Sequence, residues 1–221
     1  MIEELAREGV DTGEWAVVPN ALMHIIKPPA PDERDVLRER GPVRIVARAE
    51  PHKGIAEMLK AYPAGLGRPL QIVLAEAGFE YWQGMQNEVV TECRALAAAL
   101  PDVEILPALP WQQVPGFLAG AAATVISSTS PETFGNVAAE ALSVGTPVVG
   151  YGLGHLPALT GPAGRLTALE NGPEALWKAL AALLGDPAAY HAASQHGPRQ
   201  VAAHTPTAVA QAFLASTGMI R

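Results

Sequence analysis

The stretch SSTSPETFGNVAAEALSVGTPVVGYGLGHLP, from Ser127 to Pro157, decides the fold class of this chain of 221 residues. The run of small and β-branched residues from Ala122 to Ser128 predicts a buried parallel strand, and Pro147 to Gly150 predicts the next one. Between them the apolar residues have helical spacing, and Gly145 stands where a left-handed helix cap is expected. A strand, a small-residue loop, a short helix and a second strand together indicate a ligand site.

The turn at Gly135 places backbone N–H groups where an anion can bind. Gly135, Asn136 and Val137 begin the expected helix, and the first N–H groups of a helix lack partners and lie at the positive end of its dipole. Glu132 precedes the turn, and Glu140 lies inside the helix. Taken singly, the first glutamate is explained by complementing the dipole and the second by a solvated outer face. Together with the glycine turn, they favour two carboxylates flanking one anion pocket.

A second candidate element lies upstream, in VRIVARAEPHKG from Val43 to Gly54. Its apolar strand ends in a loop that presents two cations, Arg48 and Lys53. Arginine offers a planar fork and lysine a mobile point charge, which are the side chains that phosphate recognition uses. Such a pair alone is weak evidence, because most pairs of this kind are surface charges. Its position before the glutamate stretch indicates a phosphate loop.

These two elements resemble one known family. Residues 132–149 resemble the E-x7-E signature of retaining glycosyltransferases of family four, which have the GT-B fold. Residues 43–54 resemble the strand-loop element of that family, residues 17–20 its hinge-side segment, and residues 103–109 the strand and turn whose backbone reads the nucleobase. The resemblance implies an enzyme that transfers a sugar from a nucleotide-diphosphate-sugar donor with retention of anomeric configuration.

The resemblance implies a role for each candidate site residue. Arg48 and Lys53 are expected to stabilise the departing diphosphate and Glu132 to position the donor sugar, so these three form the expected catalytic set. Glu140 is expected to bind the ribose hydroxyls. The other expected substrate-binding residues contact the diphosphate, the sugar or the base, and they are Phe134, Gly135, Asn136, Val137, Ala108 and Leu109.

The resemblance covers nearly the whole chain but only half of a family enzyme. Residues 1–41 are expected to supply a hinge-side helix, strand and connector of the same unit as residues 42–221. Residues 42–221 are expected to form the nucleotide-sugar-binding, Rossmann-like domain. The acceptor-binding domain that precedes it in the family is absent from this sequence. It is expected to be a partner, as another domain or as a separate subunit.

Strands and helices alternate along the chain, which predicts the α/β class with a Rossmann-like, doubly wound parallel sheet, the C-terminal half of a GT-B fold. Further strands are expected at Trp15–Val18, Leu70–Ala75 and Val103–Leu106. Helices are expected at Met1–Glu8, Asp35–Glu39, Ile55–Tyr62, Trp82–Leu100, Val114–Ala121, Glu174–Leu184, Tyr190–Val201 and Pro206–Ser216.

Composition excludes several other classes. The net charge of −7 argues against nucleic acid as a partner. The single Cys93 excludes an internal disulfide and fits a cytoplasmic protein, and Glu3 and Glu4 argue against a signal peptide. The uncharged run 105–131 is broken by prolines and glutamines, so no transmembrane segment is expected. Peripheral membrane contact is expected only through the missing domain.

No coenzyme or divalent metal is expected either. The chain has no Asp-x-Asp pair and no zinc-binding histidine motif, so the donor is expected to bind without metal. Three alternatives to a glycosyltransferase stay open. They are a GT-B nucleotide-sugar 2-epimerase, a non-catalytic nucleotide-binding subunit that completes a separate acceptor-domain polypeptide, and a GT-B relic without a ligand.

Overall fold

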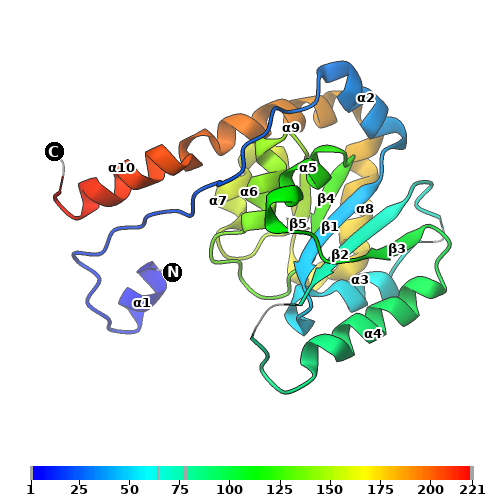
Figure 1. The fold of residues 1–221 in the computed structure, drawn as a ribbon, viewed down its shortest axis with the longest axis horizontal. Coiled ribbons are helices and arrows are strands. Elements are labelled where there is room, and N and C mark those ends of the chain that lie inside the picture. Colours follow the sequence, from blue (N-terminus) through cyan, green and yellow to red (C-terminus); the bar gives the residue numbers. More distant parts are fainter. Residues whose placement is uncertain (1, 64, 77–78, 220–221) are drawn as a thin grey trace.

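The computed structural model describes residues 2–63, 65–76 and 79–219. Its centre is a six-stranded parallel sheet with the strand order β3-β2-β1-β4-β5-β6 (Figure 1). The strands are β1 (Val43–Arg48), β2 (Leu70–Ala75), β3 (Val103–Leu106), β4 (Ala123–Ile126), β5 (Val148–Tyr151) and β6 (Gly164–Thr167). The order reverses between β1 and β4, which is where ligands bind in doubly wound sheets. The predicted α/β class is confirmed.

Helices cover both faces of the sheet, and each face has its own hydrophobic cluster. One face packs against α3 (Ile55–Lys60), α4 (Met85–Ala98) and α8 (Gly172–Gly185). The other packs against α5 (Val114–Ala119), α6 (Asn136–Ser143) and α7 (Leu156–Thr160). The remaining helices are α1 (Ile2–Arg7), α2 (Pro31–Arg40), α9 (Pro187–Gln200) and α10 (Pro206–Ser216). None of the helices within the described ranges has the length and apolar character that crossing a membrane requires.

Arg34 fastens α2 to the sheet domain. Its side chain is buried, with Nη1 donating to the carbonyl oxygen of Ala121 at 2.8 Å and Nη2 to that of Val144 at 2.6 Å. A further bond joins Nη2 to Thr146 Oγ1. These carbonyls follow the last turns of α5 and α6, where helix dipoles are negative, so a cation is stabilised there. Burial lowers the pKa of Arg34 below its ordinary value.

The strand expected at Trp15–Val18, in the N-terminal segment, is not present in the structure. Residues 15–18 form no strand, and the side chains of Trp15 and Val17 are 53% and 73% exposed. The apolar run has β propensity, but a strand also needs a neighbour for its backbone N–H and C=O groups. β3 and β6 form the edges of the sheet, and neither of them pairs with this segment. The helix expected at residues 1–8 is α1, and Met1 lies outside the described residues.

Two observed elements were not predicted from the sequence. β6 has the sequence Gly-Arg-Leu-Thr, and all four residues are half-buried, so it lacks the apolar run of a central strand. α7 carries Pro157 in its first turn, where proline is tolerated. The helix expected at Pro206–Ser216 is α10 with the same ends. The other expected helices are present with shifted ends; the one expected from Trp82 begins at Met85.

Candidate functional site

A cleft of about 330 Å³ lies at the carboxyl ends of β1 and β4, where the strand order reverses. Seven of the ten predicted site residues line it, namely Arg48, Lys53, Glu132, Phe134, Gly135, Asn136 and Val137. The other three, Glu140, Ala108 and Leu109, do not line it. Asn20, from the N-terminal segment, also lines the cleft, although it was not among the predicted site residues.

Two loops join above the sheet to form one wall of the cleft. Ser127 Oγ, at the end of β4, donates to the carbonyl oxygen of Lys53 at 2.7 Å, and the Thr129 N–H donates to that of His52 at 2.8 Å. Gly54 has φ +67°, and a Cβ there would lie 2.3 Å from the carbonyl oxygen of Ser127. Only glycine permits this approach, which holds Lys53 at the edge of the cleft.

Lys53 and Glu132 form an ion pair inside the cleft. Lys53 Nζ lies 2.7 Å from Glu132 Oε1, and Ser128 Oγ donates to the same oxygen at 2.5 Å. The side chains of Lys53 and Glu132 are only 16% and 19% exposed. Burial raises the pKa of Glu132, but the hydrogen bonds from Lys53 and Ser128 and the charge of Lys53 outweigh it, so the pKa is lowered. An anion that binds Lys53 must therefore compete with Glu132.

Arg48 is oriented by a carboxylate that sequence reasoning missed. Its Nη1 lies 2.8 Å from Glu50 Oε1, while His52 Nε2 lies 3.1 Å from Glu50 Oε2. The Glu50 side chain is only 1% exposed, whereas that of Arg48 is half exposed. The alternation Arg-x-Glu-x-His in the loop after a strand was the available signal. Glu50 thus holds the guanidinium of Arg48 beside the cleft and leaves part of it accessible.

The N-terminus of α6 forms the opposite wall. Gly135 precedes the helix with φ +90°, and no side chain caps the helix. A Cβ added at Gly135 would lie 3.2 Å from Leu159 Cδ2, so the turn packs closely on α7. The first N–H groups of an uncapped helix are free to bind an anion. Asn136 and Val137 line the same cleft as the two cations, Arg48 and Lys53.

Glu140 lies one turn further along α6 and is half-buried. Burial raises its pKa from 4.5 to about 7. Its carboxylate forms no hydrogen bond or ion pair with the described part of the chain. A desolvated carboxylate without a partner gains stability from any hydroxyl donor that reaches it.

The raised pKa of Glu140 predicts a pH dependence of stability. The folded protein holds this proton more tightly than the unfolded chain, so stability is lost as pH rises from about 4.5 to about 7. The loss is at most about 3 kcal/mol and is reduced by solvent screening of the half-buried group. Urea unfolding at several pH values should show this loss in the wild type and not in Glu140→Gln. Parallel curves for the two proteins would contradict the assignment.

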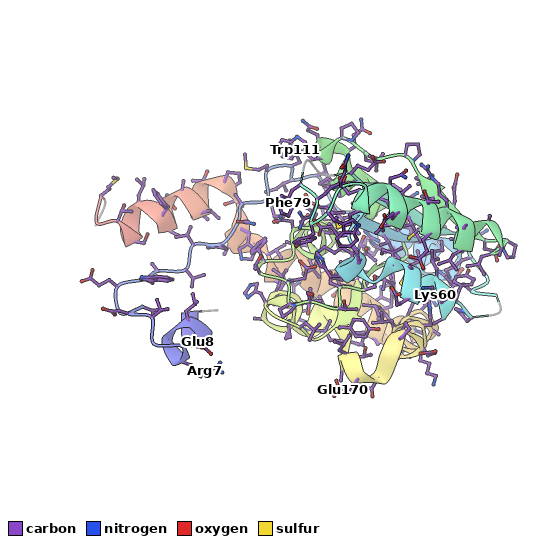
Figure 2. The ribbon with its side chains drawn as sticks, turned by 90° about the horizontal axis from the view of Figure 1, so that it is seen from below. Arg7, Glu8, Lys60, Phe79, Trp111 and Glu170 are labelled. Atoms are coloured by element: carbon purple, nitrogen blue, oxygen red, sulfur yellow. The ribbon has the colours of Figure 1, made fainter. Side chains whose placement is uncertain are left out.

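The loop after β3 carries the residues expected to read the base. Ala108 is exposed and Leu109 half-buried, and neither contributes to the cleft. The next residue but one, Trp111, is exposed and packs edge-on against His24 with ring centroids 4.2 Å apart. Figure 2 shows Trp111 at the rim of the body. The N-terminal segment thus contacts this loop.

No group of three or more His, Cys, Asp or Glu side chains within residues 2–63, 65–76 and 79–219 is arranged to hold a metal ion. Donor binding without metal stays a prediction, which the binding experiment below tests.

Several solved structures have a fold similar to that of this chain. Sucrose-phosphate synthase from Thermosynechococcus elongatus matches with TM-score 0.76 and 21% identity over 97% of this chain and 56% of that one. Anabaena HepE in complex with UDP and glucose matches with TM-score 0.77 and 19% identity over 99% and 61%. The C-terminal domain of the group 1 glycosyl transferase LpcC from Francisella tularensis matches with TM-score 0.61 and 15% identity over 80% and 94%.

The predicted Rossmann-like half of a GT-B fold is confirmed by these neighbours. The chain spans little more than half the length of the first two. No curated protein matches it significantly by sequence. The profile described as "Glycosyl transferases group 1" matches residues 38–200, well over half of the chain, and the protein therefore belongs to the glycosyl transferases group 1 family.

Proposed function

We propose that this chain is the donor-binding domain of a retaining glycosyltransferase of family four, which uses a nucleotide-diphosphate-sugar. One observation carries the proposal. Arg48 and Lys53 meet Glu132 and the uncapped start of α6 in a single cleft at the point where the strand order reverses. Two cations opposite a row of backbone N–H groups fit a diphosphate, and a carboxylate beside them fits the hydroxyls of a sugar.

The geometry explains how the donor would be activated. Negative charge grows on the diphosphate as its bond to the sugar breaks, and Arg48, Lys53 and the N–H groups of α6 stabilise that charge. When Lys53 turns from Glu132 to the phosphate, Glu132 loses one of its two donors. Its oxygen then becomes available to a hydroxyl of the donor sugar. Ion-pair exchange thus links recognition of the phosphate to recognition of the sugar.

Glu140 is the residue that we assign to the ribose of the nucleotide donor. Its unpaired carboxylate would accept hydrogen bonds from the two ribose hydroxyls, and such bonds favour the charged form. HepE, which shares the fold, has been crystallised with UDP-glucose. A nucleoside diphosphate joined to a sugar is therefore the ligand class that we propose for this chain.

The acceptor is bound, in this proposal, by a second domain or subunit. The chain covers 56% and 61% of the sucrose-phosphate synthase and HepE chains named above. α10 has an apolar sequence but buries none of its residues, and α1 and α10 extend from the same side of the body (Figures 1 and 2). These exposed surfaces suit packing against another domain, which would bring the acceptor into line with the donor.

We propose that the protein acts in the cytoplasm, since its buried Cys93 is a free thiol.

A thermal-shift panel of UDP-, GDP- and ADP-sugars tests the proposed donor class. A ligand at about 100 times its Kd adds nearly 3 kcal/mol of stability, which for a chain of this size raises Tm by about 5–10 °C. We expect one base to give this shift, and the free sugars used as controls to give none. EDTA should leave the Kd unchanged, because the two cations take the place of a metal. A tenfold loss on chelation would reveal a metal site, and no shift with any donor would refute the function.

A further inference from the structure

A short N-terminal segment, residues 20–24, is held to the rest of the chain at three points, and the first of them lies in the cleft. Asn20 Nδ2 donates to Asn136 Oδ1 at 3.1 Å. The Leu22 N–H donates to the carbonyl oxygen of His204 at 2.7 Å, and the Leu22 side chain is buried. His24 packs against Trp111. The segment therefore has a fixed course although it contains no helix or strand.

Asn20 and Asn136 line the same cleft from different parts of the chain. Asn136 is the first residue of α6 and, like Asn20, it is exposed, so its side chain starts beside the uncapped N–H groups of the helix and in the cleft that Arg48 and Lys53 also line. A primary amide has an accepting oxygen and a donating NH2 group. Because Asn20 donates to the oxygen of Asn136, the NH2 group of Asn136 is the end left for the cleft. The reverse orientation would turn a lone pair toward an anion.

We propose that Asn20 is a positioning residue for the diphosphate, acting by holding the Asn136 amide with its NH2 group toward the phosphate oxygens. The inference rests on the proposed function and deepens it, because residue 20 lies outside the region 38–200 that matches the family. The burial of Leu22 and the packing of His24 fix Asn20 in place beforehand. Asn20 is thus already in position in the folded protein, so binding of the diphosphate need not order it.

A double-mutant cycle tests this coupling. UDP, GDP and ADP are titrated calorimetrically into the wild type, Asn20→Ala, Asn136→Ala and the double variant. We expect each single variant to bind its preferred diphosphate about ten- to a hundredfold more weakly, the range of one hydrogen bond to a charged group. The double variant should be no weaker than Asn136→Ala, because both changes remove the same phosphate contact. Asn87→Ala, a change at an exposed position of α4, is the matched control.

The nucleoside provides a second readout that a merely structural role would not give. Asn20→Ala should bind the corresponding nucleoside as the wild type does, because the nucleoside has no phosphate for Asn136 to contact. Equal losses for nucleoside and diphosphate, additive losses in the double variant, or an Asn20→Ala affinity equal to that of the wild type would each overturn the inference. A wild type that binds none of the diphosphates would instead refute the proposed function.

Discussion

Lys53→Ala is expected to weaken nucleoside diphosphate binding by about ten- to a hundredfold and to leave nucleoside binding unchanged. A hydrogen bond to a charged group contributes about 1.5–3 kcal/mol, and the phosphate loses this bond in the variant. The loss of affinity should lie near the upper end of that range. Without Lys53, whose Nζ lies 2.7 Å from Glu132 Oε1, Glu132 would keep an uncompensated negative charge beside the phosphate. Calorimetric titration with both ligands measures the difference.

Lys60→Ala is the matched control for this experiment. Lys60 carries the same charge but is half exposed and pairs with Glu57 and Glu92, on α3 and α4. The Lys60→Ala variant should bind the diphosphate as the wild type does. High salt should reduce the Lys53 effect, since salt screens partly accessible charges. If Lys53→Ala lost nucleoside and diphosphate affinity equally, the lysine would not be acting on the phosphate.

Gly54→Ala is expected to destabilise the protein by about 2–4 kcal/mol. The left-handed conformation costs an alanine about 1–2 kcal/mol. A Cβ only 2.3 Å from the Ser127 carbonyl oxygen would also push the two loops apart. The hydrogen bonds that Lys53 and His52 accept from the β4 loop would then be strained, at about 0.5–1.5 kcal/mol each. Urea unfolding measures the change in free energy.

Gly185→Ala separates this effect from a general cost of replacing glycine. Gly185 ends α8, its φ is not positive, and nothing lies within 4 Å of its Cβ position. It should change stability by no more than about 0.5 kcal/mol. Similar losses in the two variants would show that the loop contact is not what requires glycine at residue 54.

Much of the fold and site could be predicted from the sequence because the relevant signals are local. The strands β4 and β5 are short, buried apolar runs, and β1 has an apolar centre at residues 45–47. The order of these strands along the chain, with helices between them, allows few topologies. Gly135 and Gly145 mark turns with positive φ, as observed. The candidate phosphate loop was recognised because Arg48 ends a strand and Lys53 follows in the loop after it. Seven of the ten site residues predicted from the sequence thus line the cleft, although they are fewer than half of the eighteen residues that form it.

Only the tertiary structure decided the features that depend on a neighbour distant in sequence. Residues 15–18 have strand propensity but no strand to pair with, whereas β6 lacks the apolar pattern but completes an edge. The raised pKa of Glu140 is a consequence of burial, which arises only when α6 packs. The ion pair of Lys53 with Glu132 and the bond from Asn20 to Asn136 join side chains far apart along the chain. A sequence shows the residue types, but hydrogen-bond partners and desolvation are set by the packing of the folded chain.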